Sequence, residues 1–255
     1  MTTAHLFAGI GGFALASDWM GWHTAFNCEV DEKLRNFLKS KWPDAHSYGD
    51  INHADFTIFR NKIDVLTGGP PCQPVSLAGN QLGEDDHRFL WNQTFRALRE
   101  IQPPWAVFEN VPGLLTMQRG MVLERICTAM ENEGYEVQTL DIPAQAKGAD
   151  HRRDRLWIIA HASGKRRAQF NPTAITKRQK KRHVRHNTVR SFKYGNASRD
   201  TVVSRILRAA NGLSEGLAPW HRNAAIKAAG NAIQPQIAHA IYQAIEAAEM
   251  THNDQ

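Results

Sequence analysis

The sequence has few cysteines, and the three that it has lie far apart. Cys28, Cys72 and Cys127 are odd in number and form no Cys-x-x-Cys pair, which argues against a disulfide framework and a cysteine zinc site. Long hydrophobic runs are absent as well, since no segment approaches the ~18 apolar residues of a membrane-spanning helix. The first residues lack the basic and then apolar pattern of a signal peptide. We therefore expect a cytoplasmic protein without a membrane segment or a metal, whose thiols stay reduced.

Acidic residues are nearly missing from residues 164–208, which hold 14 Lys and Arg but a single acid, Asp200. This stretch carries a net charge of +13, so the rest of the chain carries −7. A basic block on an acidic body indicates a site for a polyanion, although a solvated charged loop has the same composition. The candidate phosphate contacts are Lys165, Arg166, Arg167, Lys177, Arg178, Lys180, Lys181, Arg182, Arg185 and Arg190.

Short apolar runs alternate with amphipathic stretches from residue 4 to about residue 161. The runs that we predict to be strands cover residues 4–8, 24–30, 64–67, 105–109 and 156–160. The stretches that we predict to be helices cover residues 11–20, 31–41 and 119–133. This alternation predicts an α/β fold with a doubly wound sheet, in which ligands bind at the carboxyl ends of the strands.

The periodicity stops near residue 163 and is strongest again in residues 232–249. An apolar residue recurs there every four positions, as on one buried helix face; the four are Ile233, Ile237, Ile241 and Ile245. We therefore predict three parts of the chain. They are a large domain over residues 1–162, a short basic region over residues 163–210, and a C-terminal segment over residues 211–255 whose helix returns to the large domain.

A glycine-rich turn follows the first predicted strand. Its residues are Phe7, Gly9, Ile10, Gly11 and Gly12. Glycines let the backbone approach a ligand closely, and the N-terminus of the following helix favours polar or anionic groups. A plain tight turn would use the same residues, so this turn alone does not define a site.

Two acids follow the next two predicted strands. Glu29 ends the second strand, about 20 residues after the turn, where a carboxylate can bind the ribose hydroxyls of a nucleoside cofactor. Asp50, in the segment Tyr48-Gly49-Asp50-Ile51, follows a further predicted strand that lies before the one over residues 64–67, and it can accept a hydrogen bond from an adenine amino group there. Each acid alone is as well explained as a surface or capping residue. Three such features at successive strand ends nevertheless predict a site for a nucleotide-like cofactor.

Cys72 lies in a stiff loop, Gly68-Gly69-Pro70-Pro71-Cys72-Gln73-Pro74. Prolines fix φ and remove hydrogen-bond donors, so such a loop presents the thiol in one direction. A free thiol with a pKa of ~8.5 is partly ionised at neutral pH, and an electropositive site would raise that fraction. Most lone cysteines are small buried hydrophobes, but a position between prolines after a strand is unfavourable for a core residue.

Two further groups can take part in acid–base or anion chemistry. Glu109 closes an apolar strand, and a carboxyl shielded from water can act as a proton donor near neutrality. His151, Arg153 and Arg155 precede or enter the strand over residues 156–160, and alternate residues of a strand share a face. Two guanidiniums on one face suit a planar heterocycle or a phosphate, although an ion-pair lattice with nearby acids is an equal alternative.

Taken in order, these segments resemble the DNA (cytosine-5)-methyltransferase family, in particular its short phage- and prophage-like members. The resemblance covers residues 6 to 161 and again residues 211 to 244. It is carried by Phe-x-Gly-x-Gly-Gly, Pro-Cys-Gln, Glu-Asn-Val, Arg-x-Arg and Gly-Asn-Ala, which occur in the family order. Each motif alone is modest evidence, but the ordered set is very specific.

The resemblance implies a Rossmann-like methyltransferase fold that uses S-adenosylmethionine and double-stranded DNA, as a monomer and without a metal. Cys72, Glu109, Arg153 and Arg155 match catalytic positions, and Gln73 and Ser76 are expected to contact DNA. The residues that match cofactor positions are Phe7, Gly9, Ile10, Gly11, Gly12, Glu29, Val30, Asp50, Ile51, Pro70, Leu90, Asn231 and Ala232. The implied reaction is transfer of a methyl group to carbon 5 of a flipped-out cytosine, in restriction-modification or as an orphan enzyme.

The chain departs from the family pattern in three places. His5 stands where Asp or Ser is commoner, and we expect it to alter a hydrogen bond on the cofactor side. His151 replaces a commoner Gln. The target-recognition region, residues 163–210, is short and mostly basic, so we predict a short recognition site or relaxed specificity. RNA methylation, a catalytically silent DNA-binding homologue and a modified methyl donor remain alternatives to the main hypothesis.

Overall fold

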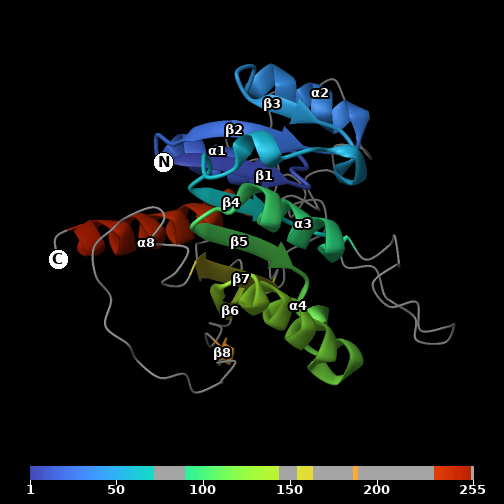
Figure 1. Cartoon of the computed structure of the whole chain (residues 1–255), viewed down its shortest axis with the longest axis vertical. Helices are drawn as coiled ribbons and strands as arrows, with labels where there is room; N and C mark the ends of the chain where they lie inside the picture. Colours follow the sequence, from blue (N-terminus) through green and yellow to red (C-terminus); the bar gives the residue numbers. More distant parts are fainter. Residues whose placement is uncertain (72–89, 144–153, 163–185, 189–232, 254–255) are drawn as a thin grey trace, which may run out of the picture. The chain divides into compact units, whose positions relative to one another are not determined.

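The computed structural model describes residues 1–71, 90–143, 154–162, 186–188 and 233–253. The chain forms two compact units. The first comprises residues 1–54, 143–153 and 190–255, and the second comprises residues 55–142 and 154–189. Figure 1 shows the helices and strands along the chain. Among the described residues, no helix is both long and apolar enough to cross a membrane.

The first unit is built on parallel strands with helical crossovers. Its elements are β1 (Thr2–Leu6), α1 (Gly12–Trp19), β2 (His23–Cys28), α2 (Glu32–Lys41), β3 (His46–Tyr48), the 3-10 helix η1 (Ile51–His53) and α8 (Pro235–Asn253). The strand order is β3-β2-β1, with both pairs parallel. Parallel strands require crossover connections, and α1 and α2 supply them. The carboxyl ends of the three strands therefore lie along one edge.

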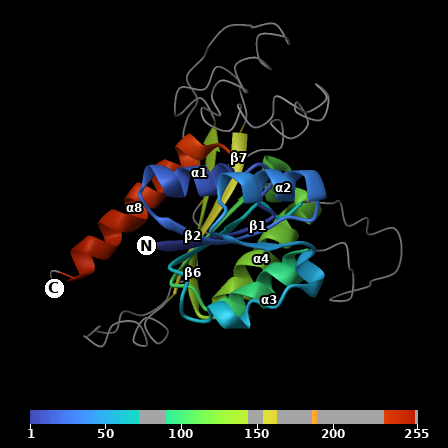
Figure 2. The same cartoon turned by 90° about the horizontal axis from the view of Figure 1, so that it is seen from above.

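Helix α8 packs against α1 within this unit (Figure 2). Ile237, Ile241 and Ile245 are buried, which confirms the predicted apolar helix face over these three residues. Ile233 is buried as well but precedes the helix, which begins at Pro235 and not at residue 232. The contact also has a polar and an aromatic part. Trp22 stacks on Tyr242 with ring centroids 4.8 Å apart, and its Nε1 donates to Glu246 Oε1 at 3.2 Å. The last helix is thereby fixed to the first.

The second unit mixes parallel and antiparallel strands. Its elements are η2 (Thr57–Phe59), β4 (Val65–Gly68), α3 (Trp91–Ile101), β5 (Trp105–Asn110), η3 (Pro112–Leu115), η4 (Met117–Gly120), α4 (Met121–Asn132), β6 (Tyr135–Pro143), β7 (Asp154–Ala162) and β8 (His186–Thr188). The strand order is β4-β5-β7-β6-β8. β4 and β5 are parallel, whereas β7 runs antiparallel to β5. The end of β5 therefore lies beside the start of β7.

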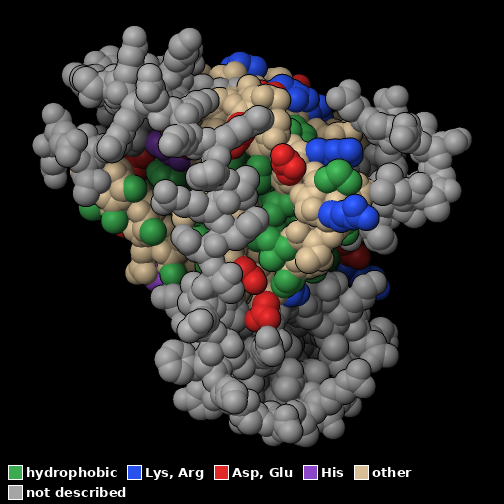
Figure 3. All heavy atoms as spheres, turned by 90° about the horizontal axis from the view of Figure 1, so that it is seen from below, with side chains coloured by type: hydrophobic (Ala, Val, Ile, Leu, Met, Phe, Trp, Pro, Cys, Tyr) green, Lys and Arg blue, Asp and Glu red, His purple; other side chains and the backbone are tan. Residues whose placement is uncertain are grey.

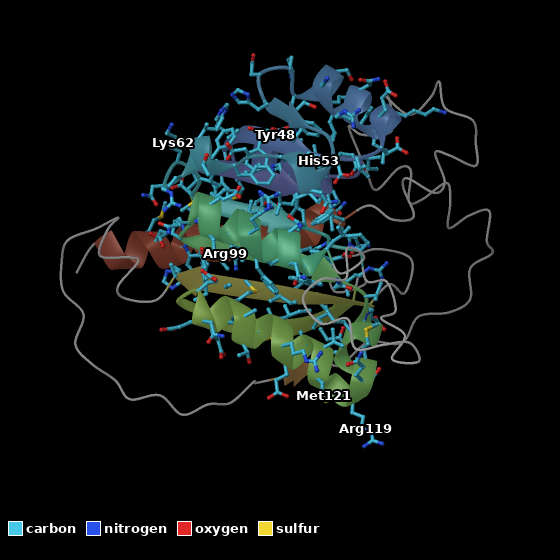
Figure 4. The ribbon with its side chains drawn as sticks, turned by 45° about the vertical axis from the view of Figure 1, so that its right-hand side comes forward. Tyr48, His53, Lys62, Arg99, Arg119 and Met121 are labelled. Atoms are coloured by element: carbon cyan, nitrogen blue, oxygen red, sulfur yellow. The ribbon has the colours of Figure 1, made fainter. Side chains whose placement is uncertain are left out.

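Helix α4 begins after an unusual turn. Gln118 and Arg119 both have positive φ, 50° and 58°, and Gly120 follows at 86°. Glycine adopts this conformation freely, whereas other residues pay a steric cost. The turn directs Arg119 and Met121 away from the body of the second unit (Figure 4).

Candidate active site

The glycine turn after β1 has a backbone that only some residues tolerate. Phe7, Gly9 and Gly11 all have positive φ, at 51°, 57° and 84°. Gly11 is the N-cap of α1. At Gly12 a Cβ would lie 2.5 Å from the carbonyl oxygen of Ile233, so glycine is required for close packing there. At Gly9 a Cβ would meet no described atom within 4 Å. The backbone at Gly9 therefore borders open space.

Glu29 is tied directly to this turn. Its Oε2 accepts a hydrogen bond from the Gly9 amide at 2.8 Å, and its Oε1 accepts one from the Asp31 amide at 3.0 Å. Arg35 Nη1 donates to the carbonyl oxygens of Glu29 and Val30, both at 3.0 Å. The Glu29 carboxylate is buried, while Val30 beside it is 67% exposed. The structure thus brings together the turn and the acid that the sequence separates by 20 positions.

Asp50 is the N-cap of η1, directly after β3. Its Oδ1 accepts hydrogen bonds from the Asn52 backbone amide at 2.9 Å and from the Asn52 side chain at 2.8 Å. These bonds fix the direction of the carboxyl group. Ile51 beside it is buried. Figure 4 marks Tyr48, in β3 before Asp50, and His53, in η1 after it. Asp50 thus stands at the same edge of the first unit as Glu29.

His5 has partners inside the first unit. Its ring is fully buried, and Nε2 lies 3.4 Å from Thr24 Oγ1 and 3.3 Å from Thr3 Oγ1. The ring also stacks parallel to Phe13 of α1. Burial lowers the pKa of His5 to about 3, because the charged imidazolium loses its hydration. The side chain is therefore a neutral polar group within the core.

Glu109, which is buried, and Arg155, which is half-buried, form an ion pair in the second unit. Arg155 Nε lies 2.8 Å from Glu109 Oε1, and the two side chains are only 21% and 10% exposed. The antiparallel register of β5 and β7 places Glu109 opposite Trp157, so Arg155 is its diagonal neighbour. Arg155 Nη1 also donates to the Asp154 carbonyl oxygen at 2.9 Å. Two predicted catalytic residues thus meet at one strand end.

Asn110 links this strand end to the segment that leads to Cys72. Its Nδ2 donates to the carbonyl oxygen of Pro70 at 3.0 Å, and its Oδ1 accepts from the Val111 amide at 2.9 Å. Asn110 and Pro70 are both buried. Asn110 belongs to the Glu-Asn-Val motif, but no role was predicted for it. The signal in the sequence is an amide residue directly after the predicted strand over residues 105–109 and before Val111 and Pro112.

Several predicted site residues lie outside the described part of the chain. They are Cys72, Gln73, Ser76, His151, Arg153, Asn231, Ala232 and all ten basic candidates for phosphate contact. Among the remaining predicted cofactor residues, Pro70 and Leu90 belong to the second unit and the others to the first. In Figure 3 the described Lys and Arg side chains lie among acidic, apolar and polar ones on the face drawn.

The other two cysteines are buried and free. Burial, and to a smaller extent the nearby Glu131, raises the pKa of the Cys127 thiol to about 11. Cys28 Sγ donates to the Gly49 carbonyl oxygen at 3.3 Å. Neither environment activates a thiol, since reactive cysteines need an electropositive and partly exposed site. No cluster of metal-binding side chains occurs among the residues that the structure describes.

Comparison with known proteins gives one family and one fold. A family model for C-5 cytosine-specific DNA methylases matches residues 1–211. The type II methyltransferase M.Eco47II of Escherichia coli is 38% identical over 165 residues, which are 62% of this chain and 39% of that enzyme. The chain thus spans well under half the length of this curated relative.

Two solved structures share the fold. EhMeth, a methyltransferase of Entamoeba histolytica, has a TM-score of 0.63 at 12% identity and covers 95% of this chain and 97% of its own. A DNMT2 variant of Spodoptera frugiperda has a TM-score of 0.55 at 18% identity, covering 76% and 56%. These likenesses confirm the α/β, Rossmann-like fold that the sequence predicted.

Proposed function

Because the chain belongs to the C-5 cytosine-specific DNA methylase family, we propose that it transfers a methyl group to carbon 5 of cytosine in double-stranded DNA. The observation that carries this proposal is the Glu109–Arg155 pair beside the Asn110–Pro70 contact. The carboxyl group lies near the end of β5, the guanidinium lies at the start of β7, and Pro70, which leads to Cys72, follows the end of β4. These are the groups that a reaction on a cytosine ring through a thiol requires.

The methyl donor in this proposal is S-adenosylmethionine, and the first unit suits it. The donor supplies an electrophilic methyl group on a sulfonium. Glu29 keeps carboxylate lone pairs for the ribose hydroxyls beyond the two amide bonds that it accepts, and the exposed Val30 offers an apolar surface to the adenine ring. Asp50 can accept from the adenine amino group. The open space at Gly9 lets the ligand approach the backbone.

The covalent chemistry is assigned to Cys72 and Glu109. The Cys72 thiolate adds to C6 of the cytosine, and the electron pair of the C5–C6 double bond moves toward C5 and N3. Glu109 stabilises or protonates N3, so that C5 becomes nucleophilic and takes the methyl group, whose bond to the donor's sulfonium sulfur breaks and leaves a neutral thioether. Transfer of the C5 proton to water, and return of any N3 proton to Glu109, then re-forms the double bond as the C6–S bond breaks, which returns the thiolate. An unactivated cytosine C5 is too weak a nucleophile for this transfer.

Arg153 and Arg155 hold the base and the catalytic carboxyl group in this proposal. The 2.8 Å contact with Arg155 Nε fixes the direction of the Glu109 carboxylate, and a planar guanidinium can do this better than an ammonium. The target base leaves the duplex to reach the site, because its C6 is inaccessible within the stack. Gln73 and Ser76 would contact the DNA as part of the Cys72 loop.

We divide the chain into a catalytic and cofactor-binding part over residues 1–162, a basic region over residues 163–210 and a C-terminal segment over residues 211–255. DNA binding is assigned to the basic region. Its Lys and Arg can neutralise phosphates, which supplies affinity but little sequence information. We therefore propose a short recognition site or relaxed specificity for a monomeric cytoplasmic enzyme that protects DNA against restriction or acts alone. Bisulfite sequencing of DNA from cells that express the protein tests this. Methylation confined to one site of six or more bases would contradict it.

Transfer of a labelled methyl group tests the reaction itself. The protein is incubated with labelled S-adenosylmethionine and either duplex DNA or total tRNA, and mass spectrometry of the digested nucleic acid identifies the product. We expect 5-methylcytosine in the DNA only, and none with Cys72→Ser. Label in tRNA alone would instead assign the enzyme to RNA. A product other than 5-methylcytosine would indicate a modified donor.

A further inference from the structure

Trp42 lies against the glycine turn from the end of α2. A Cβ placed on Gly11 would lie 2.5 Å from Trp42 Cζ3, 2.6 Å from Trp42 Cη2 and 3.0 Å from Leu38 Cδ2. The indole ring therefore occupies the space that a side chain at Gly11 would need. Trp42 itself is the C-cap of α2, and its amide donates to the Leu38 carbonyl oxygen at 2.8 Å. The ring packs on the turn from a fixed helix end.

Asp18 holds this ring in place. Trp42 Nε1 donates to both carboxylate oxygens of Asp18, at 2.9 and 3.1 Å. Asp18 lies in α1, seven residues after Gly11, and residues seven apart share one face of a helix. The indole thus spans two turns of α1, with its N–H end at Asp18 and its six-membered ring at Gly11. A hydrogen bond to an ionised partner is stronger than a neutral one.

The turn needs such support for two reasons. Phe7 has a positive φ of 51°, which costs a residue with a side chain, and Gly9 and Gly11 have many other conformations open to them. In addition, α1 begins without a side-chain cap at Gly11. A strained conformation persists only where the surroundings over-determine it. Glu29 holds the turn at Gly9, and Trp42 confines it at Gly11. The two contacts lie on different residues, so each restricts a different part of the turn.

We propose that Trp42, oriented by Asp18, is a positioning residue that keeps the Phe7–Gly11 turn in the conformation that binds the methyl donor. The proposal rests on the proposed function, since it deepens the role of the same turn. Trp42 touches the turn and not the reacting atoms. It acts by raising the fraction of molecules whose turn is competent to bind. A fall of that fraction to ~10% weakens the apparent affinity about tenfold.

The test uses two substitutions that break the same hydrogen bonds from opposite ends. Trp42→Phe keeps an aromatic ring but removes the N–H donor, and Asp18→Ala removes the acceptor. We measure the Kd for S-adenosylhomocysteine by calorimetry, and the KM for S-adenosylmethionine together with kcat on duplex DNA. Each variant should raise Kd and KM about 5- to 10-fold and change kcat less than twofold. The double variant should match either single one, because both remove one shared interaction.

The control is Trp19→Phe, which changes a 41% exposed tryptophan next to Asp18 in the same helix. It should leave Kd, KM and kcat at wild-type values. If the Trp42 and Asp18 variants lower Tm but keep the wild-type Kd and KM, Trp42 is merely structural and the inference is overturned. A wild-type protein that binds no S-adenosylhomocysteine would overturn the proposed function instead, and with it the basis of the inference.

Discussion

The two compact units hold their functional groups in different ways. In the first, the proposed donor site is mainly backbone: a turn with three positive φ values, fixed by Glu29 and bordered by Trp42. In the second, the proposed catalytic site consists of side chains at strand ends, the Glu109–Arg155 pair and the Asn110 amide. Substitutions in the two units should therefore affect different properties of the enzyme. Changes in the first unit should weaken donor binding, and changes in the second should slow the chemistry.

Replacing Glu109 by Gln should have the largest effect. The amide cannot protonate N3 and leaves Arg155 without its buried counter-charge, so we expect kcat to fall by about 10²–10⁴-fold and stability by roughly 3–5 kcal/mol. The Kd for S-adenosylhomocysteine should stay at its wild-type value. Single-turnover assays, chemical denaturation and calorimetry measure the three quantities.

A matched control for this change exists in the same unit. Glu133 pairs with Arg99 at 3.3 Å, and the Arg99 side chain is 54% exposed. Exposed pairs contribute only about 0–1 kcal/mol, so Glu133→Gln should change neither kcat nor stability much. A fall in kcat equal to that of Glu109→Gln would mean that loss of any ion pair disables the unit.

Replacing Gly11 by Ala should produce the largest effect in the first unit. The new Cβ would meet the Trp42 ring at 2.5 Å while φ is +84°, so the turn must shift. We expect the KM for S-adenosylmethionine to rise more than tenfold, with a competent fraction below ~10%. Gly21→Ala is the control, because Gly21 has φ +67° but nothing within 4 Å of a Cβ. If Gly21→Ala raises KM equally, the turn has no special role.

Replacing Asn110 by Ala should have a smaller effect on the chemistry. The Pro70 carbonyl oxygen would lose its buried donor, which costs roughly 1–3 kcal/mol and loosens the segment before Cys72. We expect kcat to fall about tenfold, a change of ~1.4 kcal/mol in the barrier.

In the first unit, Asn52→Ala removes a side-chain amide that holds Asp50. This substitution should raise the Kd for the methyl donor and leave kcat unchanged. If Asn110→Ala changed only the donor Kd and Asn52→Ala changed only kcat, the proposed difference between the two units would be contradicted.

The smallest effect at neutral pH concerns His5. Its folded pKa is lowered to about 3 from 6.5, so below pH 6.5 the unfolded chain binds a proton that the folded chain does not. Stability should therefore be complete above pH 6.5 and should fall by up to about 1.4 kcal/mol per pH unit toward pH 3. Denaturation curves of wild type and His5→Gln between pH 4.5 and 8 measure this. Equal slopes in both proteins would contradict the assignment.

Much of the first unit could be predicted from the sequence. Glu29 and Asp50 follow strands in a regular βαβ pattern, so their shared edge follows from topology. The first strand was predicted over residues 4–8, but β1 covers Thr2–Leu6. Phe7 has a positive φ and belongs to the turn, which an apolar residue type does not reveal.

The second unit was less predictable, because its key relations are non-local. Amino-acid composition does not indicate the direction of a strand, so the antiparallel direction of β7 could not be predicted. Helix α3 and strand β6 were not predicted either, because they contain many polar residues. The contact of Asn110 with Pro70 joins residues 40 positions apart. The contact between Trp42 and Gly11 is also non-local, and a tryptophan at a helix end is usually a core residue, so its contact with the turn could not be predicted.

The central claim is that Cys72 is the nucleophile, and one measurement tests it most directly. Duplex DNA with 5-fluorocytosine at the target position is incubated with the protein and saturating S-adenosylmethionine, and intact mass spectrometry follows the complex. Fluorine at C5 cannot leave as a proton does, so the C6–S bond should persist and give a covalent complex. Cys72→Ser should give none, because Cys28 and Cys127 are buried. No covalent complex with wild-type protein that binds the DNA and the donor, or one that survives in Cys72→Ser, would contradict the account.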